Sequence, residues 1–161
     1  MEHRVAPLAE ILRLNTVLFR NCLDGLTDET ACVRPTGDTN SAAFVAAHLT
    51  NSRFFLLKLL GVDDADPLSR YLDGRKAIGD VVEMPPLAEI ASAWTRVSRQ
   101  LRDRCATLSD ADLDAPASMR FPLSDGTLMS TFTFLVQHDS YHVGQLSLLR
   151  KYYGLPAMRY Q

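Results

Sequence analysis

Apolar residues recur every three or four positions along most of this chain, which is the spacing that one face of an α-helix requires. No segment of comparable length alternates apolar and polar residues as a half-buried strand would. The pattern therefore predicts an all-α protein. The stripe of the first predicted helix consists of Leu8, Ile11, Leu12, Leu18, Phe19 and Cys22, with Asn15 as a polar interruption.

Start and stop signals place the ends of four such helices. The side chain of Asn40 or Ser41 can cap the second helix, and Gly61 can take the left-handed conformation that follows its last turn. Pro86 suits the first position of the third helix, and the glycine and proline of 154–156 stop the fourth. The predicted helices span roughly 5–24, 40–61, 86–108 and 128–153.

Three long connections, near 25–39, 61–85 and 109–127, separate these helices. Connections beyond about 12–15 residues are unusual in compact domains and often serve as lids or binding segments. We expect a short extra helix around Leu68–Leu72. Four helices of similar length pack naturally as a bundle, so we expect a four-helix bundle with long connecting loops.

Length and composition fit one domain, spanning residues 1–161. The chain has 161 residues, of which 47% are hydrophobic and 22% charged, as in an ordinary globular domain. Its net charge of −2 lacks the basic excess of a nucleic-acid binder. We therefore expect no nucleic-acid partner.

Nothing in the sequence predicts export or membrane insertion. Glu2 stands where a signal peptide needs basic residues, and the longest apolar run, Phe54–Leu60, is interrupted by Lys58. The three cysteines, Cys22, Cys32 and Cys105, are odd in number and show no CxxC spacing. We expect a soluble, cytoplasmic protein with reduced thiols and no membrane contact.

Two histidines, His138 and His142, lie four residues apart in the fourth predicted helix. This spacing places both imidazoles on one face, one turn apart, as two ligands of a single metal ion from one helix would be. His48 lies midway along the second helix among apolar residues, where its side chain faces the interior or a cleft. Three nitrogens from facing helices of a bundle leave open coordination positions, as in catalytic metal sites.

The alternative to a metal site is structural. A histidine that stands alone on a helix, as His48 does, is more often a hydrogen-bonded core residue than a metal ligand. His138 and His142 can together line a polar seam between helices. The placement of all three on two long helices favours metal binding. His3, near the terminus, is assigned no role.

Several motifs resemble those of the DinB/YfiT-like family of metal-dependent enzymes, over nearly the whole chain. Residues 25–29, Arg34-Pro35 and Asn40-Ser41 resemble the loop between the first two helices of that family. His48-Leu49 resembles its first metal-binding histidine, and 138–146, HDSYHVGQL, is similar to its signature. One departure is Ala43-Phe44-Val45, where many members have a tryptophan.

The resemblance implies a four-helix bundle of up-down-down-up topology that is often dimeric. It also implies a divalent metal ion, zinc or nickel, bound by His48, His138 and His142. Family members include transferases and isomerases that use a low-molecular-weight thiol, so fold membership does not fix the reaction.

The residues that share helix faces with the histidines are mostly apolar, so we expect the candidate metal site to have mostly apolar walls. These include Phe44 near His48 and Phe134 near His138. Asp139 follows His138 but points about 100° away around the helix, so we do not count it as a ligand. Polar neighbours are expected to hydrogen-bond to the backbone or to support the ligands rather than to react: Asn15, Ser52 and Gln145, with Tyr141 at the rim.

Two functions remain open at this point. The first is a metal-dependent enzyme in which the ion activates a thiol or water against a small-molecule substrate, of transferase or hydrolase type. The second is a non-catalytic stress-response protein that binds a metal or a small ligand. No catalytic residue or general base is identified, since the histidine helix contains no glutamate and no HExxH motif.

A homodimer is also expected. Phe132, Val136 and Val143 lie roughly opposite the histidines on the fourth helix. They would face water unless something covered them, and a second copy of the same helix is the simplest cover.

Overall fold

The computed structural model describes the chain except residues 1–3, 73–76, 120, 124 and 161. His3 thus lies outside the described residues. All elements longer than a turn within the described part are helical, as the sequence pattern predicts. They are α1 (Ala6–Leu23), α2 (Asp28–Cys32), α3 (Ala42–Leu59), α4 (Ser69–Leu72), the 3₁₀ turn η1 (Ile78–Asp80), α5 (Leu87–Cys105), α6 (Asp110–Asp114) and α7 (Leu128–Tyr152).

The four long predicted helices are confirmed, and their ends follow the expected signals. The Ser41 hydroxyl accepts a hydrogen bond from the Phe44 backbone N–H at 3.3 Å and so caps α3. Gly61 and Gly154 follow α3 and α7 with φ of 84° and 78°, in the region that only glycine enters freely. Pro86 immediately precedes α5 rather than being its first residue.

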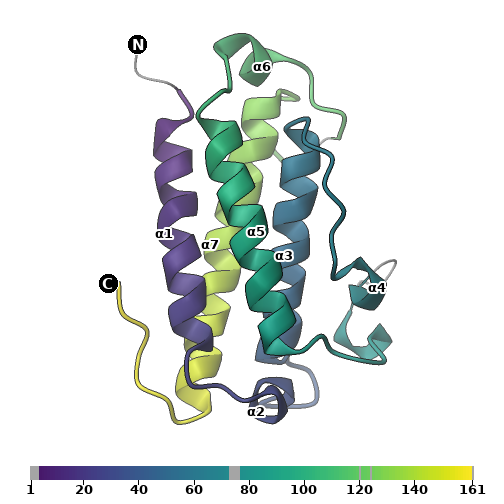
Figure 1. Ribbon diagram of the computed structural model, residues 1–161, viewed down its shortest axis with the longest axis vertical. Helices are drawn as coiled ribbons and strands as arrows, with labels where there is room; N and C mark the ends of the chain where they lie inside the picture. The colour runs from purple at the N-terminus through teal and green to yellow at the C-terminus, as the bar shows by residue number, and fades with distance from the viewer. Residues whose placement is uncertain (1–3, 73–76, 120, 124, 161) are drawn as a thin grey trace.

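The four long helices form a bundle of up-down-down-up topology (Figure 1). Helix α1 packs against α7 and α5, and α3 packs against the same two. The last turns of α3 and α5 lie at one end, where Arg104 Nε donates to the Leu60 carbonyl at 2.8 Å. At the other end, Arg150 of α7 donates to the carbonyl of Asp24, the residue that follows α1. Thus α1 and α7 run in one direction and α3 and α5 in the other.

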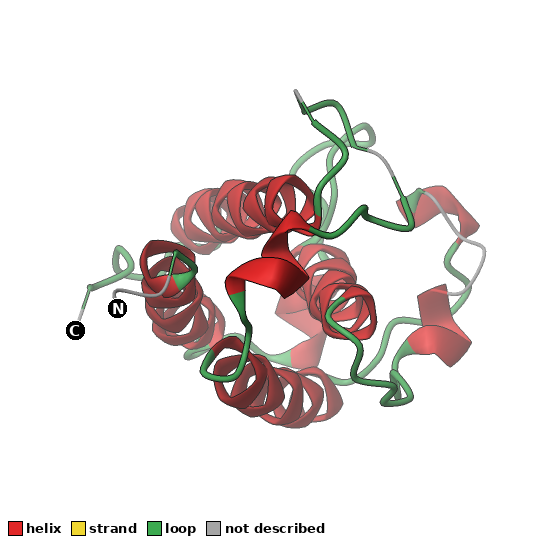
Figure 2. Ribbon diagram, turned by 90° about the horizontal axis from the view of Figure 1, so that it is seen from above, coloured by secondary structure: helices red, strands yellow, loops and turns green. Residues whose placement is uncertain are grey.

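This topology explains the long connections. Because α3 and α5 are parallel, residues 60–86 must return along the bundle, and the chain forms α4 and η1 on the way. The other two connections cross the bundle ends, where α2 and α6 lie (Figures 1 and 2). The short helix predicted around Leu68–Leu72 is confirmed as α4. Helices α2 and α6 were not predicted, because five residues are too few to show a helical period.

The core is continuous and aromatic at its centre. Trp94 of α5 stacks on Phe19 of α1 with ring centroids 3.8 Å apart, and both side chains are fully buried. Cys22 and Cys105 lie in this core as free thiols, which matches their place on apolar stripes. Packing of stripes from all four long helices, rather than helix propensity alone, holds the bundle together.

The core also corrects the reasoning behind the expected dimer. Phe132, Val136 and Val143 are 0–3% exposed in the single chain. Neighbouring helices α1 and α3 cover α7 on both sides, so these residues need no second copy. Helix α7 instead exposes Tyr141, Leu148 and Tyr152.

Within the described residues, no helix is both long and apolar enough to cross a membrane.

Candidate metal centre

Three imidazoles meet on the inner surface between α3 and α7. His48 comes from α3, and His138 and His142 come from consecutive turns of α7. His138 Nε2 lies 3.3 Å from His48 Nε2 and 3.0 Å from His142 Nε2. Because α3 and α7 are antiparallel neighbours, residues 90 positions apart in the sequence face each other here.

The spacing of these nitrogens suits a single ion. Zinc binds imidazole nitrogen at about 2.0–2.1 Å in tetrahedral geometry, which puts two ligand nitrogens roughly 3.3 Å apart. One ligand atom from each of the three side chains lies within 4.8 Å of the others. The donor set therefore fits a divalent transition ion, with a coordination position left over.

Gln145, one turn beyond His142, determines which nitrogen of that ring carries the proton. The Gln145 side-chain carbonyl, Oε1, lies 2.7 Å from His142 Nδ1, and its amide nitrogen donates to the Tyr141 hydroxyl at 3.1 Å. Since a carbonyl can only accept, Nδ1 of a neutral His142 carries the proton. The lone pair is then on Nε2, directed at the other two imidazoles.

Burial keeps all three rings neutral near pH 7. Desolvation and the neighbouring imidazoles lower the pKa of His48 to about 4, and desolvation lowers that of His138 to about 4 and that of His142 in the same direction. A neutral imidazole is the form that binds a metal. His138 Nδ1 is buried and has no hydrogen-bond partner among the described residues, unlike His142 Nδ1.

Aromatic rings enclose the histidines, as the sequence predicts for Phe44 and Phe134. The Phe44 ring stacks on His48 at 6.1 Å between centroids, and the Phe134 ring stacks on His138 at 6.5 Å. Phe121 stacks in turn on Phe134 at 4.6 Å. Sequence reasoning missed Phe121, because it lies in an irregular connection where periodicity carries no information.

Asp139 lies behind the histidines and is not part of the cluster. Its carboxylate is buried and accepts two hydrogen bonds from Arg53, at 3.0 and 2.7 Å. The Arg53 guanidinium also lies 3.6 Å from the centre of the Trp94 ring. Sequence reasoning missed Arg53, although an arginine among the apolar residues of α3 is itself a signal of a buried ion pair.

The other polar neighbours support the helices rather than the imidazoles. Ser52 donates to the backbone carbonyl of His48 at 3.0 Å, as expected. Asn15 is buried and donates to Ser140 at 2.9 Å, so it joins α1 to α7 without reaching a histidine. Of the three expected supporting residues, Gln145 alone forms a hydrogen bond with a cluster ring among the described residues.

Comparison with known proteins agrees with this arrangement. The sequence model described as the DinB superfamily matches residues 11–146. A DinB-like protein from Bacillus cereus has a similar crystal structure, with a TM-score of 0.75 and 19% identity over 99% of each chain. A conserved protein from Enterococcus faecalis gives a TM-score of 0.73 at 13% identity, covering 94% of this chain and 97% of its own. At these identities the two structures support the fold alone, and no curated protein matches the sequence.

Proposed function

The chain belongs to the DinB superfamily, and from that premise we propose that it is a metal-dependent enzyme acting on a small electrophilic substrate. His48, His138 and His142 would hold one divalent ion, zinc or nickel. The observation that supports this is the convergence of three neutral imidazole nitrogens, with His138 Nε2 3.3 and 3.0 Å from the other two.

The donor set narrows the choice of ion. Imidazole ligands suit zinc, nickel, copper and iron, whereas magnesium and calcium prefer oxygen. A bound ion with an open position lowers the pKa of water from 15.7 to about 7, or stabilises a thiolate. Water as the nucleophile makes the enzyme a hydrolase, and a low-molecular-weight thiol makes it a transferase.

The chain's own residues would prepare the site in two ways. Gln145 holds the proton on His142 Nδ1, so that Nε2 presents a lone pair. Phe44 and Phe134 lie beside two of the three imidazoles and make their surroundings apolar. The Tyr141 ring lies 5.1 Å from that of His142, and its hydroxyl can donate a hydrogen bond at the exposed edge of the cluster.

A second function, metal or small-ligand binding without turnover, has one observation in its favour. The metal-ligating group found among the described residues contains three histidines and no carboxylate. A general base of the usual kind is therefore missing from that group.

Metal content tests the binding half of the proposal. Protein purified without an affinity tag should contain about one zinc or nickel per chain by elemental analysis. His48→Ala or His142→Ala should weaken binding at least about 100-fold, since loss of mere supporting contacts already costs 10–100-fold. His3→Ala is the matched control and should keep full affinity. Unchanged metal content in both cluster variants, with lower melting temperatures, would instead identify the imidazoles as core residues.

Turnover tests the catalytic half. The metal-free, reconstituted and His48→Ala proteins should be compared on electrophilic substrates, with and without small thiols, following thiol loss and hydrolysis separately. Activity restricted to the reconstituted wild type supports an enzyme. Stoichiometric metal binding with no turnover on either panel supports the binding protein.

Three wider expectations belong to the same proposal. We take residues 1–161 as one metal-binding domain, working in the cytoplasm. The homodimer rests on the family resemblance, and the residues that a pair formed through α7 would bury are Tyr141, Leu148 and Tyr152. Sedimentation at high micromolar concentration tests it, and a monomer there would contradict it.

A further inference from the structure

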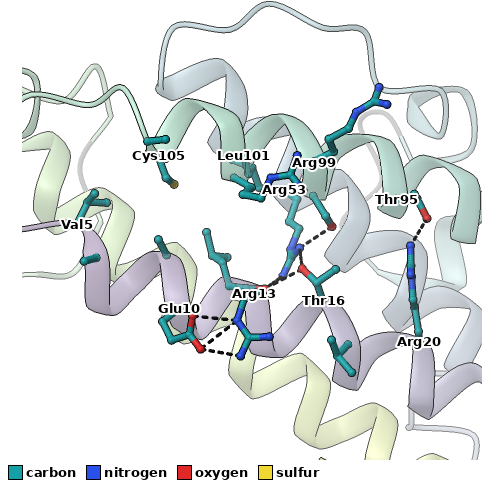
Figure 3. A pocket seen from close by; sticks show the side chains of 17 residues that line it. Val5, Glu10, Arg13, Thr16, Arg20, Arg53, Thr95, Arg99, Leu101 and Cys105 are labelled. Carbon is teal, nitrogen blue, oxygen red and sulfur yellow. Dashed lines mark hydrogen bonds and ion pairs between the residues drawn. The ribbon is translucent and has the colours of Figure 1, made fainter. Parts of the chain in front are cut away.

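A groove of about 630 Å³ lies on the opposite side of the bundle from the histidines, along the seam between α1 and α5 (Figure 3). Its size falls within the roughly 300–1,000 Å³ of sites for small molecules. None of the three cluster histidines lines it. We propose that this groove binds an amphipathic carboxylate, with an apolar medium-length chain along one half and the anionic head at the other.

Apolar side chains line one end of the groove, beside the paired charges of Glu10, Arg13 and Arg102. Val5, just before α1, lies across the groove from Leu101 and Cys105 of α5. Leu12 of α1 lines the same pocket. All four side chains are buried to 5% exposure or less. Burial raises the pKa of the Cys105 thiol to about 11, so the thiol is neutral near pH 7. This end therefore suits an alkyl chain.

The other end carries hydroxyl groups and positive charge. Because α1 and α5 are antiparallel, Arg20 and Thr95 face each other and are joined by a hydrogen bond of 2.8 Å. Thr16 and Ser98 lie one turn further in, and both hydroxyl oxygens accept from Arg53 at 2.7 Å. These two pairs follow one another along the seam, so the lining changes along the groove from mainly apolar side chains to hydroxyl groups and a basic side chain.

The charge of the lining favours an anion. Four arginines and one glutamate border the groove, apart from Arg53, although the whole chain has a net charge of −2. Arg13 is paired with Glu10 and Arg102 with Asp103. Arg20 has a hydroxyl partner rather than an acid, so its charge is available to a carboxylate.

The floor of the groove does not compete for that carboxylate. The Arg53 guanidinium donates all of its hydrogen bonds within the protein, to Asp139, Thr16, Ser98 and the Leu12 carbonyl. Positive charge for the head therefore comes from Arg20 and from Arg99, neither of which has an acidic partner among the described residues. The Ser98 hydroxyl accepts from Arg53, and its proton can turn toward the groove. A cationic or uncharged head would gain nothing from this end.

Calorimetry with dodecanoate, below its micelle-forming concentration, tests the proposal directly. Wild-type protein should bind one dodecanoate per chain, and dodecanol and acetate should each bind at least about ten-fold more weakly, since one lacks the charge and the other the chain. Equal binding of dodecanol and dodecanoate would overturn the role of the basic end.

Two variants with matched controls locate the site. Arg20→Glu should weaken dodecanoate binding about ten-fold or more. Lys58→Glu makes the same change in net charge at an exposed position of α3 and should leave binding unchanged. Ala9→Phe should fill the groove, whereas Ala91→Phe adds the same ring on an exposed part of α5. If all four variants bind like wild type, the fatty chain lies elsewhere, for instance on the exposed face of α7, and the proposal fails.

The readout separates this proposal from the metal chemistry. Binding is measured on metal-free protein, so loss of the groove and loss of the metal site are distinguishable. An unchanged far-ultraviolet circular dichroism spectrum shows that the Ala9→Phe protein is folded. If Ala9→Phe does not fold, the Arg20→Glu variant still tests the proposal. If Ala9→Phe changes the sedimentation of the protein while no carboxylate binds, the groove is a contact between chains, and the small-molecule proposal is wrong.

Discussion

Single residues could be predicted from the sequence where helical spacing determines their neighbours. His48, His138, His142, Phe44 and Gln145 all lie where the spacing places them. The role of Gln145 needed the structure, because only the contact with His142 Nδ1 shows which proton it holds. No rule of spacing distinguishes a supporting glutamine from a surface one.

At this scale, we predict that Gln145 strengthens metal binding through His142. Gln145→Leu removes the acceptor of the Nδ1 proton and should weaken zinc affinity about 10–100-fold, as loss of such supporting contacts usually does. Chelator competition measures the affinity. Gln145→Glu keeps an acceptor and should restore binding. Gln137→Leu, an exposed change on the same helix, is the control, and equal loss there would mean that a general disturbance of α7 is responsible.

Whole elements were predictable to the extent that they are long. Four helices of 18 residues or more show their stripes and end signals in the sequence, and all four are found within three residues of the predicted ends. The five-residue helices α2 and α6 show neither. The cross-helix ion pair between Arg53 of α3 and Asp139 of α7 was not predicted either, since it joins residues 86 positions apart.

We predict that this ion pair connects α3 to α7 without holding the metal. Asp139→Asn leaves the Arg53 charge buried without a counter-ion, and breaking such a pair typically costs about 3–5 kcal/mol of stability. Urea denaturation measures this loss. Removal of the exposed Arg13–Glu10 pair by Arg13→Met should change stability little, because solvent screens that pair.

The metal content of folded Asp139→Asn protein gives the second half of this test. At low temperature the variant should still bind one ion per chain, because Asp139 faces Arg53 and not the imidazoles. Loss of the ion from a folded variant would place a carboxylate among the metal's close neighbours after all.

At the scale of the whole molecule, the sequence predicts the bundle but not where the seams between its helices are closed and where they leave a groove. Helical stripes indicate which faces are buried, yet the width of each seam depends on side chains from two helices at once. The groove between α1 and α5 is a consequence of such a seam, with Ala6 and Ala9 opposite Leu101 and Cys105. Phe132, Val136 and Val143 are buried because α1 and α3 pack against α7. The pattern of α7 alone does not show those neighbours, and it therefore suggested a dimer.

The histidine cluster has a consequence for the stability of the whole chain at acidic pH. His48 and His138 have a pKa of about 4 in the folded protein, against about 6.5 in an unfolded chain. Between these two values the unfolded state binds more protons, so acidification favours unfolding. The stabilisation from the neutral imidazoles is complete above pH 7, is lost as the pH falls from 6.5 toward 4, and changes no further below that.

We therefore predict that metal-free protein loses stability between pH 7 and pH 5, on the order of 2 kcal/mol from His48 and a smaller amount from the less buried His138, measured by urea denaturation at each pH. Carboxyl groups with a lowered pKa, such as Asp125 at about 2, change the stability at lower pH. The change between pH 7 and pH 5 therefore comes from the histidines. A double variant, His48→Gln with His138→Gln, should flatten the dependence. With zinc bound, stability at pH 7 should be higher and its loss on acidification steeper, because protons then displace the ion as well. A flat profile for the metal-free wild type would mean that the imidazoles are hydrated and protonate freely in the folded state.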